Sequence, residues 1–128
     1  MHIDHTTFRT NHLEQTRDFL IAIFELVEGP RPATIAAAVD GYWLYHNNWP
    51  LIHIIQSQPT MQDRQDDAAE AIDHTAFVLK NYDSFKQKLI DLNIQFSVMD
   101  VPELSIRRIF LRTPRGILIE TIFKDLEG

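Results

Sequence analysis

The chain contains one short segment twice, and this repeat constrains the fold more than any other feature. Ile3-Asp4-His5-Thr6-Thr7-Phe8 recurs 69 residues later as Ile72-Asp73-His74-Thr75-Ala76-Phe77, with five of the six residues identical. Composition alone does not produce such a match in a chain without low-complexity sequence. We therefore interpret the chain as two copies of one structural unit.

A second pair of related segments follows the repeat in each half. Trp43–His53 aligns with Phe110–Glu120, so that Leu51 falls on Leu118 and Ile52 on Ile119. Both segments are apolar enough to form strands. The polar residues inside these apolar strands then form two symmetry-related pairs: His5 with His74, and His53 with Glu120.

The length and composition indicate one compact domain with a substantial core, since 45% of the 128 residues are hydrophobic. The net charge of -6 argues against nucleic acid or an anionic membrane surface as a partner. The absence of Cys excludes disulfides and thiolate metal sites. No segment approaches ~20 apolar residues and the N-terminus has no basic start, so we expect a cytoplasmic protein.

The hydrophobic periodicity predicts the same order of elements, βαβββ, in each half. It places module 1 at about residues 1–57, a polar linker at about 58–71, and module 2 at about 72–124. An α+β fold follows. The expected elements of module 1 are a strand over 2–10, a helix over 13–26, a weak strand over 33–39, and a hairpin of 42–45 and 50–56 around Asn47-Asn48. Those of module 2 are a strand over 72–79, a helix over 82–92, and strands over 94–101, 106–112 and 117–123.

The turn Thr113–Gly116 fixes the expected register of the second hairpin. Pairing Arg112 with Ile117 across this turn places Ile109 opposite Glu120, and Arg107 then shares the face of Glu120. This face makes Arg107 a candidate substrate-binding residue.

The same pairing in the first hairpin predicts the neighbours of His53: Tyr42, Leu44, Leu51 and Ile55. Tyr42 is therefore a second candidate for substrate binding. A third is Arg9, which shares a strand face with His5 and could hold an anionic group, although a surface arginine at a strand end would look the same.

Three histidines and one glutamate suit Zn, Ni, Co, Fe or Mn better than Ca or Mg. A single strand histidine is more often a hydrogen-bonded, half-buried residue than a ligand. Glu120, however, lies in the apolar run 117–123, where a buried carboxylate needs a cation or strong hydrogen bonds. The symmetry-related positions then predict one divalent transition-metal site with four ligands: His5, His53, His74 and Glu120.

The other polar and aromatic residues give weaker evidence for a functional site. His2, His12 and His46 lie outside the repeat, where exposed surface histidine is the simpler interpretation. Trp43, Tyr45 and Trp49 are interpreted as core residues rather than a pocket lining. The sequence has no recognisable nucleophile elbow and no glycine-rich phosphate loop.

These residues together resemble the vicinal-oxygen-chelate superfamily, which includes glyoxalase I, methylmalonyl-CoA epimerase, fosfomycin-resistance proteins, bleomycin-binding proteins and extradiol dioxygenases. The resemblance covers nearly the whole chain and rests on the paired βαβββ modules, His5, His74, the phrase Phe110–Gly116, and Glu120. It implies a single glyoxalase/bleomycin-resistance-like domain over 1–128, in which the modules form an incomplete barrel around a metal cavity.

Within that superfamily the chain is most similar to the short bacterial glyoxalase I. His5-Thr6 followed by Arg9 is similar to the start of those enzymes, which implies that His5 is a metal ligand and that Arg9 contacts a glutathione carboxylate. His74 and Glu120 match the ligand positions of the second module. His53 stands where glyoxalase I has glutamate.

The expected function is that of a metal-dependent, glyoxalase-like lyase or isomerase. It would act on a small molecule with adjacent oxygens through a metal-stabilised enediolate, with Glu120 as the catalytic base. One alternative is an Fe(II) extradiol dioxygenase that uses His5, His74 and Glu120 and leaves His53 outside the ligand set. Another is a non-catalytic binder of small molecules, as in the bleomycin-resistance branch. We also expect a homodimer.

Overall fold

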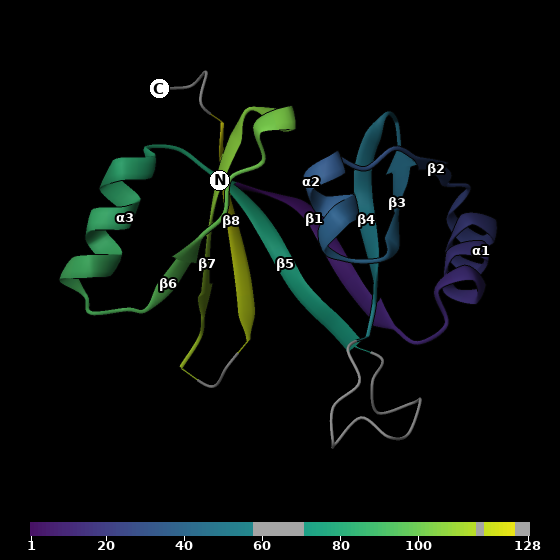
Figure 1. Ribbon diagram of the computed structural model, residues 1–128, viewed down its shortest axis with the longest axis horizontal. Coiled ribbons are helices and arrows are strands. Elements are labelled where there is room, and N and C mark those ends of the chain that lie inside the picture. The colour runs from purple at the N-terminus through teal and green to yellow at the C-terminus, as the bar shows by residue number, and fades with distance from the viewer. Residues whose placement is uncertain (58–70, 115–116, 125–128) are drawn as a thin grey trace. The chain divides into compact units, whose positions relative to one another are not determined.

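The computed structural model describes residues 1–57, 71–114 and 117–124 (Figure 1). The chain divides into two compact units, His5–Asp73 and the combination of Met1–Asp4 with His74–Gly128. Apart from Ala71, the predicted linker lies outside the described residues. No helix in the described part of the chain has the length and apolar character needed to span a membrane.

The first half of the chain follows the predicted order of elements, with one short helix added. Its sheet has the strand order β2-β3-β4-β1, in which β1 and β4 are parallel and the other pairs antiparallel. The elements in chain order are β1 (His2–Thr10), α1 (Leu13–Phe24), β2 (Val27–Gly29), α2 (Ala33–Ala38), β3 (Gly41–His46) and β4 (Trp49–Gln56).

One side of this sheet packs against α1. The fully buried Leu44 and Ile54 meet Leu20 of the helix, and Phe8 of β1 and Tyr42 of β3 border the same cluster. Truncating a buried leucine such as Leu44 to alanine costs about 2–5 kcal/mol, so this contact fixes which face of the sheet is covered. The opposite face is the one that carries the side chains of His5 and His53.

The predicted strand over 33–39 is wrong, because α2 occupies these residues as a helix. Alanine has the highest helix propensity and fills 36–38, so local preference favours the helix there. The second strand of the module is instead β2. It pairs Glu28 with Leu44, and Gly29 lies so close to the ring of Tyr45 that a Cβ would be 2.5 Å from it. The predicted helix over 13–26 ends at Phe24, because Glu25 adopts a left-handed backbone conformation with φ 54°.

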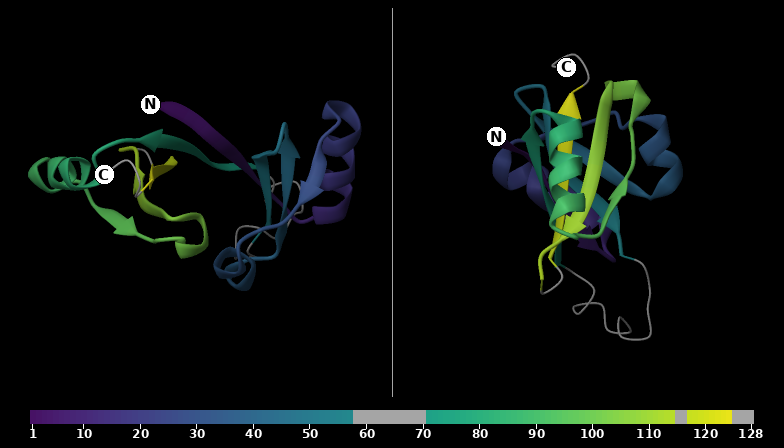
Figure 2. Two further views of the ribbon diagram at one scale, coloured as in Figure 1. Left: turned by 90° about the horizontal axis from the view of Figure 1, so that it is seen from above. Right: turned by 90° about the vertical axis from the view of Figure 1, so that its left-hand side faces the viewer.

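The second half also has the order βαβββ, which confirms the predicted α+β class. Its sheet has the strand order β5-β8-β7-β6, with β5 and β8 parallel. Figure 2 shows α3 running along one face of it. The elements are β5 (Ala71–Leu79), α3 (Tyr82–Asp91), β6 (Phe96–Val98), the 3-10 helix η2 (Pro102–Leu104), β7 (Ile106–Arg112) and β8 (Leu118–Lys124). The predicted strand over 94–101 is thus much shorter.

The two faces of this second sheet differ. Tyr82 and Leu89 of α3 form a buried cluster with Ile109 and Phe123. The opposite face carries a smaller apolar cluster of Ala76, Val78 and Ile122. Glu120 belongs to this opposite face, because side chains two residues apart on a strand share a face.

The register predicted for the second hairpin is wrong by one residue. Thr113 donates its backbone N–H to the carbonyl of Ile117, and Arg112 consequently pairs with Leu118. Phe110 therefore lies opposite Glu120, and Ile109 does not. Arg108, rather than Arg107, shares the face of Glu120. Of the turn itself, residues 115–116 lie outside the described part of the chain.

The register predicted for the first hairpin is also wrong by one residue, for a different reason. The hairpin turns at Asn47-Asn48, as the sequence predicts, and His46 pairs with Trp49 there, but a β-bulge between Leu44 and Tyr45 shifts the pairing beyond it. Trp43 therefore lies opposite His53. Tyr42 and Leu44 point to the face that α1 covers.

Candidate functional site

In the first unit, two buried histidines lie on the sheet face away from α1. The parallel pairing of β1 with β4 places Thr7 beside His53, so His5 lies on the same face two residues earlier. The rings of His5 and His53 stack with centroids 3.7 Å apart and planes 18° from parallel. Trp43 stacks on His53 with centroids 4.0 Å apart. The result is a continuous stack of three aromatic rings.

This stack limits what His53 can do in the orientation observed. The lone pair of an imidazole nitrogen lies in the plane of its ring, so near-parallel rings direct their lone pairs along separate planes. His5 and His53 could share one ion only if the ring of His53 turned out of the stack.

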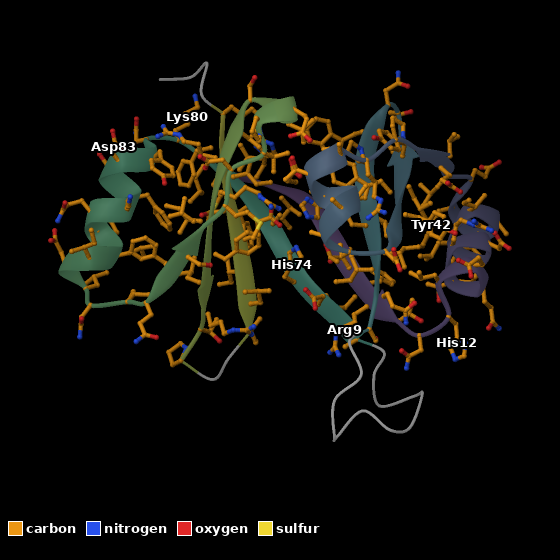
Figure 3. All side chains as sticks on the ribbon, viewed as in Figure 1. Arg9, His12, Tyr42, His74, Lys80 and Asp83 are labelled. Atoms are coloured by element: carbon orange, nitrogen blue, oxygen red, sulfur yellow. The ribbon has the colours of Figure 1, made fainter. Side chains whose placement is uncertain are left out.

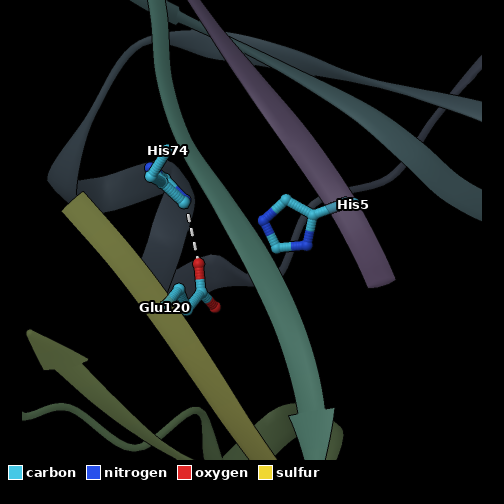
Figure 4. A group of neighbouring side chains, drawn as sticks. All are labelled: His5, His74 and Glu120. Carbon is cyan, nitrogen blue, oxygen red and sulfur yellow. Dashed lines mark ion pairs between the residues drawn. The ribbon is translucent and has the colours of Figure 1, made fainter. Parts of the chain in front are cut away.

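In the second unit, His74 and Glu120 form a close pair (Figure 4). The Nε2 atom of His74 lies 2.9 Å from Oε1 of Glu120. The side chain of Glu120 is only 2% exposed. Two ligand atoms at the right angle of an octahedral site, each about 2.1 Å from a divalent transition-metal ion, are about 3 Å apart. The nitrogen and oxygen of this pair therefore fit neighbouring ligands of one such ion.

Arg108 completes the surroundings of Glu120. Its Nη1 atom lies 3.4 Å from Oε2 of Glu120, and its Nε–H donates to the carbonyl of Met99 at 3.1 Å. The guanidinium lies 5.0 Å from the ring centroid of Phe110. Sequence reasoning missed Arg108, because the register it assumed pointed to Arg107. The signal that could have found Arg108 is the length of the turn between β7 and β8.

Arg107 lies on the face that α3 covers. Its guanidinium is 3.8 Å from the ring centroid of Tyr82, the first residue of that helix. This cation–π contact fixes Arg107 away from the face of Glu120. The predicted substrate-binding role of Arg107 assumed that Arg107 shares the face of Glu120, and the observed register contradicts that assumption.

Tyr42 likewise lies on the helix side of its sheet (Figure 3). Its hydroxyl donates to Oε2 of Glu14 on α1 at 2.8 Å, and the guanidinium of Arg17 lies 4.6 Å from its ring centroid. The hydrogen bond to Glu14 raises the pKa of Tyr42. The predicted proximity of Tyr42 to His53 is wrong, because the one-residue shift in the first hairpin places Trp43 opposite His53.

Arg9 lies on the same strand face as His5, as predicted, and has an acidic neighbour in Asp73. Its Nε atom lies 3.5 Å from Oδ1 of Asp73, and both side chains are partly exposed. The remaining histidines, His2, His12 and His46, are exposed.

The two units place their polar residues at equivalent positions. Thr7 pairs with His53 in the first sheet, and Ala76, its counterpart in the repeat, pairs with Glu120 in the second. An aromatic residue lies opposite in each hairpin: Trp43 faces His53, and Phe110 faces Glu120. These registers agree with the predicted equivalence of His53 and Glu120.

No family model matches the chain, and no curated protein matches it with significance. Several solved structures, in contrast, match the chain with significance. Methylmalonyl-CoA epimerase from Mycobacterium tuberculosis aligns with a TM-score of 0.72 at 13% identity, over 96% of this chain and 87% of that one. A variant of the Streptomyces coelicolor epimerase in complex with 2-nitronate-propionyl-CoA aligns with a TM-score of 0.65 at 18% identity, over 98% of both chains. The 2,3-dioxygenase LapB from Pseudomonas sp. KL28 aligns with a TM-score of 0.68 at 17% identity, over 96% of this chain and 40% of that one.

These similarities show that the chain has the fold of the vicinal-oxygen-chelate proteins, the class to which the paired βαβββ units had pointed. The proteins that share the fold include epimerases and a dioxygenase. At such identities the likeness concerns the fold alone.

Proposed function

We propose that the protein is a metal-dependent enzyme of the lyase or isomerase kind, acting on a small molecule with adjacent oxygens. The observation that carries the proposal is the buried His74–Glu120 pair, whose donor atoms are separated as neighbouring metal ligands are. The proposed ligands are the four that the sequence predicts: His5, His74, Glu120 and, after its ring turns, His53. Imidazole and carboxylate together favour Zn, Ni, Co, Mn or Fe.

The ion, when bound, would polarise the substrate oxygens and make the adjacent C–H more acidic. Glu120 would loosen from the ion and take the proton, since its carboxylate is the buried base of the site. The Nε2 atom of His74, 2.9 Å from that carboxylate, would be its neighbouring ligand. Arg9, on the face of His5, would hold an anionic part of the substrate in competition with Asp73.

Metal titration of a histidine variant tests the site itself. Calorimetric titration of metal-free protein with Zn²⁺, Ni²⁺ and Mn²⁺ should show binding in the wild type and its loss in His74→Ala. His12→Ala, which removes an exposed histidine at the start of α1, should bind like the wild type and serves as the control. Unchanged affinity in His74→Ala for all three ions would remove the metal site.

Activity assays test the reaction class. We expect conversion of hemithioacetals of methylglyoxal or of a related small oxygenated molecule. Turnover of the glutathione substrate should be weak, because His53 replaces the second carboxylate of glyoxalase I. Absence of turnover together with tight binding of a small ligand would instead indicate a non-catalytic binding protein.

A second candidate function is that of an Fe(II) dioxygenase, and the stacking of His53 favours it. With His53 held between His5 and Trp43, two histidines and one carboxylate remain, which is the ligand set of non-haem Fe(II) oxygenases. His53→Ala separates the candidates. The dioxygenase should keep Fe(II) binding and oxygen uptake with catechols in this variant. The lyase or isomerase should lose metal affinity.

A further inference from the structure

Arg108 is a nearly buried cation on a sheet face that also buries a carboxylate. Its side chain is 11% exposed, and the side chain of Glu120 is 2% exposed. Burying either charge alone is strongly unfavourable, and a partner of opposite charge offsets much of that cost. The pair is therefore a built feature of the second unit rather than a chance surface contact.

The contacts of Arg108 hold its guanidinium in one place. Its Nε–H donates to the carbonyl of Met99 at 3.1 Å, beyond the end of β6, and its Cζ atom lies 5.0 Å from the ring centroid of Phe110. Nη1 is then left to meet Oε2 of Glu120 at 3.4 Å. An arginine fixed at one nitrogen by the backbone presents the next one in a defined direction, since the guanidinium is planar and rigid.

The two oxygens of Glu120 thus have different neighbours. Oε2 faces Arg108 and Oε1 faces His74, at 3.4 and 2.9 Å. We propose that Arg108 is a positioning residue, which holds Glu120 as an oriented anion and directs Oε1 toward His74 and the metal. The effect of Arg108 on metal binding rests on the proposed function. The contact between Arg108 and Glu120 does not depend on it.

A double-mutant cycle in metal-free protein tests the contact. Arg108→Met should increase the unfolding equilibrium constant by about 10-fold more in the wild-type background than in a Glu120→Gln background. The reason is that methionine leaves a buried carboxylate without its cation only when Glu120 is present. Additive effects of the two substitutions would overturn the proposal. If Arg108→Met does not fold, the same cycle is run with Arg108→Gln, which is also uncharged, and the same coupling is expected.

Titration with Zn²⁺ tests positioning, which a purely structural role would not affect. Arg108→Met should weaken Zn²⁺ binding by about 10- to 100-fold, the usual effect of removing a residue that orients a metal ligand. Arg108→Lys should recover part of the loss. Arg107→Met is the matched control, since it removes the adjacent arginine on the other face and should leave Zn²⁺ affinity unchanged.

Equal or tighter Zn²⁺ binding in Arg108→Met would overturn the proposal, since the charge of Arg108 would then repel the ion more than its hydrogen bond orients Glu120. The proposed function fails in a different way. If wild-type protein binds no transition metal but the cycle shows coupling, the metal enzyme is rejected and the role of Arg108 toward Glu120 is retained.

Discussion

At the scale of single residues, the environment of each polar group decides its chemistry. His53 and Glu120 occupy equivalent positions in the two units, yet one is stacked between aromatic rings and the other is held by His74 and Arg108. The stacked ring of His53 makes its contacts through its faces, while its nitrogens lie at the ring edge. In contrast, each carboxylate oxygen of Glu120 faces a polar partner, Oε1 facing His74 and Oε2 facing Arg108. The two halves of the molecule are therefore alike in position and different in chemical capacity.

Glu120→Gln should separate metal binding from proton transfer. The amide keeps an oxygen that can coordinate weakly, so some metal should remain bound. Proton-transfer activity should fall by about 100- to 10,000-fold, because the amide cannot act as a general base. Calorimetry and the isomerase assay measure the two effects on the same preparation.

Glu103→Gln is the control for this variant, since Glu103 is an exposed carboxylate of η2. It should resemble the wild type in both measurements. Full isomerase activity in Glu120→Gln would contradict the assignment of Glu120 as the base.

At the scale of elements, short irregular features set the outcome of long regular ones. The bulge between Leu44 and Tyr45 decides that Trp43 rather than Tyr42 meets His53. The closure of Thr113 on Ile117 decides that Arg108 rather than Arg107 meets Glu120. Because side chains alternate along a strand, each one-residue shift exchanges the two faces completely.

The turn Asn47-Asn48 gives a prediction at this scale. Both residues have positive φ, 51° and 64°, as a two-residue hairpin turn of the I′ type requires. Asn48→Val should destabilise the protein by about 1–2 kcal/mol, because a β-branched side chain is strained in the left-handed region. Chemical denaturation measures the loss.

Asn48→Gly is the matched control, since glycine adopts positive φ without strain. It should be at least as stable as the wild type. A valine variant as stable as the glycine variant would show that the turn does not hold the hairpin in its register.

At the scale of the whole molecule, the two units have the same order of elements but keep separate cores. The first is built around Leu44 and Ile54, and the second around Ile109 and Phe123. Each sheet uses one face for its helix and carries its polar candidates on the other.

We predict a homodimer, because a βαβββ unit can pair with its counterpart on a second chain. The predicted linker of about residues 58–71 is long enough to allow that exchange. Light scattering at micromolar concentration should give twice the chain mass of 14.9 kDa. A monomeric mass would contradict the prediction.

The sequence by itself determined the repeat, the order βαβββ in each half, and the positions of His5, His74, His53 and Glu120 as two related pairs. These features follow from local periodicity and from the comparison of one half with the other, which need no knowledge of long-range contacts. The Asn47-Asn48 turn was equally local. The tertiary structure alone decided the registers of the two hairpins, the stacking of His53 on His5, and the contact of Arg108 with Glu120. Those depend on bulges, on loop closure and on the parallel pairing of strands far apart in the chain, and none of these leaves a mark in the hydrophobic pattern.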